Sequence, residues 1–161
     1  MAQNLEQLAI SVGKKLKEKK WKLVTAESCT GGSVAYWITS IPGSSDWFER
    51  GFVTYSNLAK EEMLGVSSAT LNTYGAVSEQ TAQEMAEGAL RYSQAQVSIA
   101  ITGIAGPTGG TPEKPVGTVW FGWAGVGFAT QTKLMSLTGN RTQIREQSIV
   151  IALENLLNLI T

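Results

Sequence analysis

Apolar residues recur along the chain at two spacings, and the helical spacing of three and four residues predicts the main helices. Leu5, Leu8, Val12 and Leu16 share one face and predict an amphipathic helix over residues 4–19. A helix is expected to open at Ser78, with that serine as its cap. The last helix, from about residue 140 to 159, is apolar over a wide arc. Such an arc is typical of deep burial or of a surface shared between subunits, and we expect a homo-oligomer, with a dimer favoured.

Short β-branched and aromatic runs predict the strands, and glycine, proline and serine clusters separate them. Five strands are expected, at residues 22–26, within 47–55, and at 97–102, 116–124 and 128–137. The glycines between the last two strands predict an antiparallel hairpin. Short helices are expected to follow the first two strands, up to residue 40 and over 57–64, and residues 65–75 to form a loop. The alternation predicts an α/β protein: a single domain over residues 1–161, folded as a three-layer α/β/α sandwich with a mixed, mostly parallel five-stranded sheet.

Composition removes several classes of protein. Thirteen basic and thirteen acidic side chains cancel, so no global field indicates nucleic acid or a membrane surface as partner. Six lysines gather between Lys14 and Lys22, where a solvated helix end explains them better than a nucleic-acid patch. Neither a signal peptide nor an apolar run of about 18 residues is present, and the single cysteine excludes an internal disulfide. We therefore expect a cytoplasmic protein.

The chain contains no histidine and only one aspartate, Asp46. Ser-His-Asp and Cys-His mechanisms and histidine-based zinc sites are therefore excluded, and a multi-aspartate magnesium centre is not expected. We expect neither a metal nor a cofactor. If a serine is activated in this chain, its base must be a lysine, a carboxylate or the terminal amine.

Residues 25–32, Thr-Ala-Glu-Ser-Cys-Thr-Gly-Gly, follow an apolar run and precede a helical pattern. Open α/β sheets place ligand sites at such junctions, where the first helical turn offers unpaired N–H groups to an anion. Ser28 is placed as an exposed nucleophile, and Thr30, Gly31 and Gly32 can let a phosphate approach the backbone. The alternative is a capped helix with glycines that serve tight packing.

Tyr55 and Lys60 lie at a second junction of the same kind. Lys60 falls near the first turn of its helix, where the dipole, with any burial, favours the neutral and basic amine. A tyrosine hydroxyl beside it can relay a proton or orient the serine. The alternative is a solvent-exposed lysine and a strand-end tyrosine.

Two further segments are candidates for binding an anion. Residues 103–110, rich in glycine, follow the best candidate for a central strand and offer free backbone N–H groups. Arg141 opens the last helix, where its charge opposes the dipole; such a position suits an anion, and a plain surface arginine fits equally well.

Five motifs, in this order, resemble the CinA C-terminal-domain family over residues 5 to 160. They are Ala26-Glu-Ser-Cys-Thr-Gly-Gly32, Phe52-Val-Thr-Tyr-Ser-Asn57, Gly75-Ala-Val-Ser78, Thr102-Gly-Ile-Ala-Gly-Pro107 and Lys114-Pro-Val-Gly117. Stand-alone members of that family are nicotinamide-nucleotide amidohydrolases. The resemblance implies hydrolysis of nicotinamide mononucleotide to nicotinate mononucleotide and ammonia, without a metal.

The resemblance also implies roles for particular residues. Ser28 becomes the nucleophile, Lys60 its base and Tyr55 the helper, and we expect the N–H groups of residues 29–32 to form an oxyanion hole. The candidates for binding the nucleotide, with its phosphate near the arginine, are Thr30, Gly31, Gly32, Thr102, Gly103 and Arg141. The sequence departs from the family at Asn140, where an acidic residue is expected, and at Thr108, where Asp or Gly is commoner.

Three alternatives stay open from the sequence. Cys29 can be the nucleophile, with its thiolate stabilised by the helix N-terminus. The chain can be a nucleotide-binding module without turnover, associated with competence or DNA damage. It can also be a hydrolase of another small amide.

Overall fold

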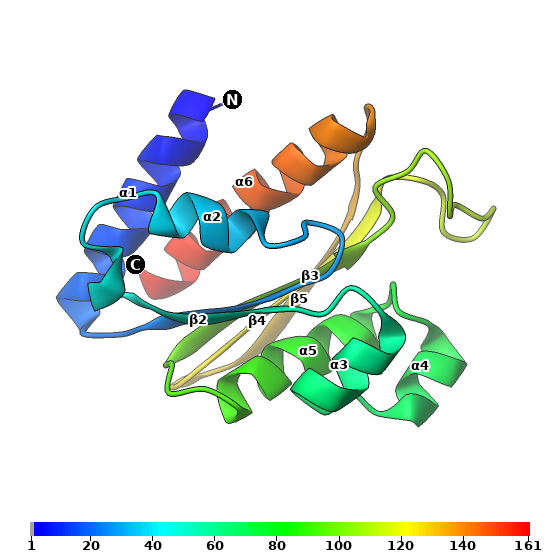
Figure 1. Ribbon diagram of the computed structural model, residues 1–161, viewed down its shortest axis with the longest axis horizontal. Coiled ribbons are helices and arrows are strands. Elements are labelled where there is room, and N and C mark those ends of the chain that lie inside the picture. Colours follow the sequence, from blue (N-terminus) through cyan, green and yellow to red (C-terminus); the bar gives the residue numbers. More distant parts are fainter. Residues whose placement is uncertain (1) are drawn as a thin grey trace.

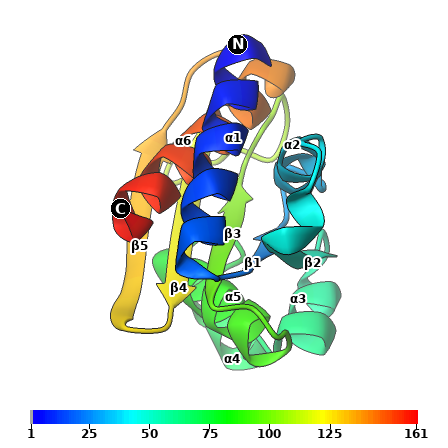
Figure 2. The same cartoon turned by 90° about the vertical axis from the view of Figure 1, so that its left-hand side faces the viewer.

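The computed structural model describes residues 2–161, in which a sheet lies between two layers of helices (Figure 1). In chain order the elements are α1 Ala2–Lys19, β1 Leu23–Glu27, α2 Ser33–Thr39, the 3-10 turn η1 Ser44–Asp46, β2 Phe48–Val53, α3 Asn57–Leu64, α4 Ser68–Tyr74, α5 Glu79–Arg91, β3 Val97–Gly103, β4 Thr118–Gly125, β5 Phe128–Ser136 and α6 Arg141–Ile160. Helices α1, α2 and α6 cover one face, and α3, α4 and α5 the other (Figure 2). The predicted three-layer α/β/α sandwich is confirmed.

The sheet of the described residues is mixed, with strand order β2-β1-β3-β4-β5. β1 pairs in parallel with both β2 and β3, whereas β3–β4 and β4–β5 are antiparallel. The strand from residue 97 is central, as predicted, and the last two strands form the expected hairpin. The chain leaves β1 for one neighbour and later reaches the other, so the strand order reverses at β1. Open sheets bind ligands beyond the carboxyl ends of the strands at such a point.

Helix caps read from the sequence are present in the structure. Ser56 accepts from the amide of Ala59, Ser78 from that of Thr81, and Asn140 forms a capping box with Gln143. The prediction of a loop over residues 65–75 is wrong, because α4 lies within it. A serine cap starts this helix and Gly75 follows it, yet its few turns carry too short an apolar stripe to be recognised as periodic.

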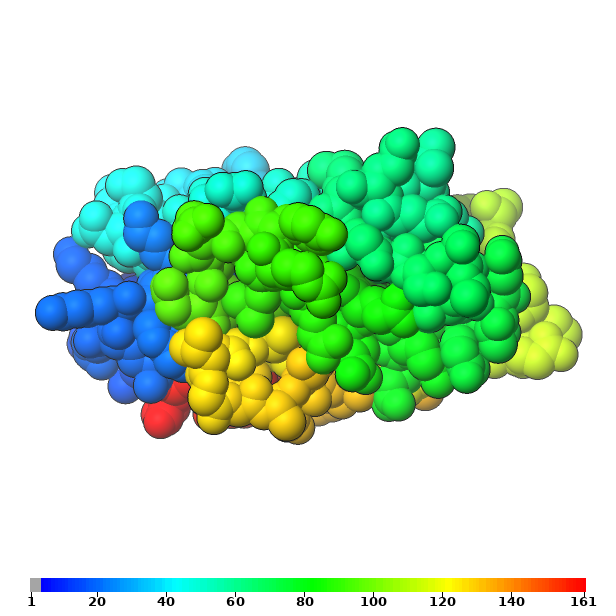
Figure 3. Space-filling view, turned by 90° about the horizontal axis from the view of Figure 1, so that it is seen from below, coloured from blue at the N-terminus to red at the C-terminus, as the bar shows by residue number. Residues whose placement is uncertain are grey.

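The two faces of the sheet are packed with side chains of different size. Large residues of β3 and β4 pack toward α1 and α6, including Ile99, Phe121 and Trp123, whose indole N–H donates to the carbonyl of Ala152 at 3.1 Å. Toward α5 the strands present small residues, so the helix can approach closely. A Cβ on Gly122 would lie 2.7 Å from the Ala82 carbonyl oxygen of α5. Figure 3 shows this face, with the α3–α5 layer beside the β4–β5 hairpin.

The apolar arc of α6 is used within the chain. Ile144, Ile149, Leu153 and Leu156 are buried against α1 and the sheet, whereas Leu159 near the end of the helix is 36% exposed. Burial within one chain therefore accounts for most of the arc, and the homo-oligomer stays a prediction. No helix in residues 2–161 is long and apolar enough to cross a membrane.

Candidate active site

A cavity of about 290 Å³ lies beyond the carboxyl ends of β1, β2 and β3, at the point where the strand order reverses. This volume is at the small end of the range for pockets that hold small ligands. Segments far apart in the sequence meet there, and its lining consists of Ser28, Cys29, Tyr55, Asn57, Lys60, Ala76, Val77, Thr102, Gly103, Ile104, Ala105, Gly106, Thr108, Gly109 and Arg141. The sheet topology has thus joined the two strand-to-helix junctions that the sequence singled out.

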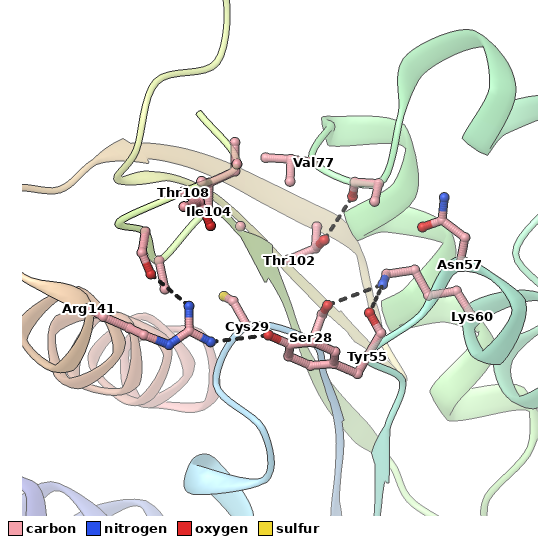
Figure 4. Close-up of a pocket in the computed structure, with 15 residues that line it drawn as sticks. Ser28, Cys29, Tyr55, Asn57, Lys60, Val77, Thr102, Ile104, Thr108 and Arg141 are labelled. Atoms are coloured by element: carbon pink, nitrogen blue, oxygen red, sulfur yellow. Dashed lines mark hydrogen bonds between the residues drawn. The ribbon is translucent and has the colours of Figure 1, made fainter. Parts of the chain in front are cut away.

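Ser28 and Lys60 face one another in this cavity (Figure 4). Their Oγ and Nζ atoms are 3.1 Å apart, although the residues are 32 positions apart in the sequence. Lys60 lies in the first full turn of α3, where its amide donates to the carbonyl of Ser56. Its side chain is almost completely buried, and Ser28, which lines the cavity, is largely buried as well. Burial lowers the pKa of Lys60 from its ordinary value of 10.5, because the charged ammonium is poorly solvated there.

The contacts of the lysine nitrogen can be made by either protonation state of the amine. Nζ donates to the carbonyl oxygens of Thr54 at 2.9 Å and Tyr55 at 3.4 Å. Carbonyls only accept, so they take up both N–H groups of a neutral amine. The remaining lone pair is then available to accept the hydroxyl proton of Ser28. In the ammonium form the third N–H would donate to Ser28 instead.

The turn after β1 does not form the expected phosphate cradle. Thr30, Gly31 and Gly32 are absent from the described lining of the cavity. The amides of Val34 and Ala35, at the start of α2, donate to the carboxylate of Glu27 at 3.0 and 3.1 Å. The N-terminus of α2, where the sequence predicts a bound anion, is therefore occupied by the carboxylate of Glu27.

Thr102, Gly103 and Arg141 do line the cavity, and Arg141 contacts Tyr55 across it. The guanidinium donates to the Gly106 carbonyl at 2.8 Å and to the Tyr55 hydroxyl at 3.1 Å. The Tyr55 ring reaches over the cavity toward the arginine, so its hydroxyl lies away from the lysine that was expected beside it (Figure 4). What Lys60 contacts is the backbone carbonyl of Tyr55.

Cys29 also lines the cavity, and its thiol is protonated at neutral pH. Burial, together with the nearby Glu27 carboxylate, raises its pKa to about 11. A reactive cysteine needs a thiolate, which is favoured in exposed and electropositive surroundings. The site therefore favours Ser28 over Cys29 as nucleophile.

Sequence reasoning missed three contributors. Glu27 precedes the nucleophile directly but was not read as the partner of the following helix. Arg145, one turn after Arg141, donates to the Thr30 carbonyl at 3.2 Å. Asn57 lines the cavity from the start of α3. An acidic residue a few positions before a helix N-terminus was the one available signal, for Glu27. Within residues 2–161 no three acidic or cysteine side chains gather as metal ligands.

Comparisons with known proteins point to one family. The family model described as the CinA C-terminal domain matches residues 5–160. A nicotinamide-nucleotide amidohydrolase PncC from Enterobacter agglomerans is 53% identical over 153 residues, which cover 95% of this chain and 93% of the relative. The protein of that name from Escherichia coli (strain K12) is 52% identical over 152 residues, covering 94% and 92%. The crystal structure of the competence/damage inducible protein CihA from Agrobacterium tumefaciens superimposes with a TM-score of 0.96 at 45% identity, covering 98% of this chain and 96% of that one.

Proposed function

The chain belongs to the CinA C-terminal-domain family, and from this we propose that it hydrolyses nicotinamide mononucleotide to nicotinate mononucleotide and ammonia. The observation that carries the proposal is the Ser28–Lys60 pair, with Oγ and Nζ 3.1 Å apart in a cavity of a chain without histidine. The names of the relatives supply the substrate, and the pair supplies chemistry that suits an amide.

In the proposed reaction, the neutral amine of Lys60 accepts the Ser28 hydroxyl proton as Oγ attacks the carboxamide carbon. The ammonium then returns that proton to the amide nitrogen, the C–N bond breaks, and ammonia leaves. An ester of nicotinate mononucleotide remains on Ser28 Oγ. Water attacks this ester, Lys60 takes up the water proton, and the proton passes to Ser28 Oγ as the carboxylate product leaves.

Backbone N–H groups next to the nucleophile are suited to stabilise the tetrahedral oxyanion. Among the described residues, the amides of Cys29, Thr30 and Gly32 donate to no backbone carbonyl, whereas that of Gly31 donates to the Ser28 carbonyl. Free N–H groups beside an attacking oxygen are the usual components of an oxyanion hole. We assign this role to the amide of Cys29, the residue of the turn after Ser28 that lines the cavity.

We place the substrate phosphate at Arg141. Lys60 and Arg141 are the cationic side chains in the described lining of the cavity, and Lys60 must be neutral to act as a base. A guanidinium suits a phosphate because its N–H groups form a planar fork. Thr102 and Gly103 lie on the cavity wall, where the ribose or the pyridine ring is expected. The Tyr55 hydroxyl accepts from the Arg141 guanidinium, and rotation of the tyrosine side chain would bring it toward Ser28 as the helper.

The test is incubation of the native protein with nicotinamide mononucleotide and chromatographic quantification of nicotinate mononucleotide together with released ammonia. Ser28→Ala and Lys60→Ala should both be inactive, and Lys133→Ala, which removes an exposed lysine of β5, should keep native turnover. Nicotinamide riboside and free nicotinamide serve as substrates without the phosphate. Binding of the mononucleotide without any product would refute the proposed hydrolase activity and indicate a non-catalytic nucleotide-binding module. Hydrolysis of another amide, but not of nicotinamide mononucleotide, would refute the proposed substrate.

A further inference from the structure

Glu27, the last residue of β1, has a carboxylate buried beneath the proposed nucleophile turn, residues 28–32. Its side chain is 1% exposed, which is rare for a glutamate unless its charge is compensated. Three donors compensate it: the hydroxyl of Thr30 at 2.6 Å and the amides of Val34 and Ala35 at 3.0 and 3.1 Å. The two amides can only donate and the short hydroxyl contact is a donation as well, so all three contacts suit a carboxylate as acceptor.

These contacts connect both ends of the nucleophile turn. The carboxylate precedes the turn in sequence, binds Thr30 within it and binds the two amides that follow it in α2. Because the amides of Val34 and Ala35 already donate to Glu27, the carbonyl groups of the turn are not needed as their acceptors. Within the turn, Cys29 lines the cavity, and among residues 2–161 its amide donates to no backbone carbonyl.

Thr30 is the central residue of this arrangement. Its side chain is fully buried and donates to Glu27, while its carbonyl accepts from the Arg145 guanidinium at 3.2 Å and from the Ser33 hydroxyl at 2.6 Å. The turn is thus fixed between a carboxylate on one side and a guanidinium from α6 on the other. The Thr30 side chain therefore binds Glu27, and Thr30 is not part of the described cavity lining.

We propose that Glu27 is a positioning residue: through Thr30 and the start of α2 it fixes the nucleophile turn so that Ser28 Oγ meets Lys60 and the Cys29 amide stays available for the oxyanion. The inference rests on the proposed function. It also accounts for the choice between two adjacent nucleophiles, because the carboxylate fills the helix end that would otherwise stabilise a Cys29 thiolate.

The first test compares Glu27→Gln with Glu84→Gln as a matched control. Glu84 also accepts a backbone amide and a threonine hydroxyl, from Ser67 at 2.9 Å and Thr70 at 2.6 Å, at the start of α4 and away from the described cavity lining. We expect Glu27→Gln to lower kcat by roughly 10- to 100-fold, the cost of a misplacement of about 1 Å. KM should change by less than about threefold, because the cavity residues are untouched. The control should keep native kcat; an equal loss in both variants would overturn the proposal.

A pair of threonine variants keeps the test decisive if Glu27→Gln fails to fold. Thr30→Ser retains the hydroxyl donor and should keep kcat within about threefold of native, whereas Thr30→Val should lose as much as Glu27→Gln. Native kcat in Thr30→Val would overturn the proposal. Circular dichroism establishes that each variant is folded before kinetics are compared.

A second readout does not depend on turnover. Cys29 is the only cysteine of the chain, so its rate of alkylation by iodoacetamide reports on this turn alone. Removing the neighbouring charge and loosening the turn should raise the rate in Glu27→Gln by about tenfold or more, and leave it unchanged in Glu84→Gln. If the native protein proves inactive on nicotinamide mononucleotide, this arm still decides: an unchanged rate in Glu27→Gln overturns the inference.

Discussion

Replacing Lys60 by methionine should separate binding from chemistry. Methionine fills a similar volume but provides neither a base nor a donor, and the hydrogen bonds of Lys60 Nζ are to the Ser28 hydroxyl and two backbone carbonyls. No other base in the described cavity lining lies beside Ser28, since the remaining titratable groups are a protonated thiol, a phenol and a guanidinium. A positioned general base contributes roughly 10²- to 10⁴-fold, or about 3–5 kcal/mol of the activation barrier. We expect a loss of kcat in the upper part of this range, with KM nearly unchanged.

The pH profile gives an independent measure of the same group. Only the free amine accepts the Ser28 proton, so kcat/KM should rise with pH through the pKa of Lys60 and then level off. Because burial lowers this pKa, the rise should be centred below 10.5. The assay is chromatographic detection of nicotinate mononucleotide from pH 6 to 10, with Lys133→Met as control. Turnover of Lys60→Met within threefold of native, or a profile independent of pH, would refute the Ser28–Lys60 mechanism.

The lowered pKa also predicts how stability depends on pH. Between the folded-state pKa of Lys60 and 10.5, the unfolded chain binds more protons than the native state, so native stability gains with pH across this window. Below the window both states carry the proton, and the cost of the buried charge is complete. Denaturant titrations should therefore show that the free energy of unfolding of the native protein increases with pH relative to that of Lys60→Met. A constant difference would contradict burial as the cause of the shift.

Three further predictions concern other parts of the molecule. Cys29→Ala should retain turnover within about threefold while Ser28→Ala loses it, because a thiol of pKa about 11 is only roughly 0.03% ionised at pH 7.5. The reverse pattern in steady-state assays would identify the cysteine as the nucleophile. Arg141→Ala should raise KM for nicotinamide mononucleotide by roughly 10- to 100-fold, which is the contribution of a charge-assisted hydrogen bond. The effect on KM for nicotinamide riboside, which lacks the phosphate, should be much smaller. Equal effects on both substrates would show that Arg141 does not bind the phosphate. Gly122→Ala should lower the free energy of unfolding by about 1–3 kcal/mol, because its Cβ would lie 2.7 Å from the Ala82 carbonyl oxygen. Calorimetry should then show a Tm lower by several degrees. An unchanged Tm would mean that α5 can shift to make room for the methyl group.

The helices and strands that sequence reasoning located share strong local signals. Periodic apolar faces and serine or asparagine caps gave α1, α5 and α6, and β-branched runs gave the strands. Helix α4 lacked a long stripe and was taken for loop. The exposure of Leu159 could not be foreseen, because α6 is apolar on more than one face and α1 decides which part is covered.

The candidate site was foreseen as chemistry more than as geometry. The absence of histidine directed attention to a lysine base, and the structure brings Lys60 to Ser28. The residues around them are fixed by long-range contacts that no local pattern encodes. The Tyr55 hydroxyl contacts Arg141, 86 positions away, instead of the nearby lysine, and the Thr30 side chain binds Glu27 instead of lining the cavity.

The Ser28–Lys60 contact carries information about the order of assembly. Its two residues are separated by the whole crossover from β1 through α2 and β2 into α3, and parallel strands cannot be closed by a short turn. The β4–β5 hairpin is local in sequence and can pair early, whereas the crossover must pay for loop closure first. In a refolding experiment, recovery of hydrolysis should therefore lag behind the first β-sheet signal. Enzymatic turnover would then time the completion of the parallel half of the sheet.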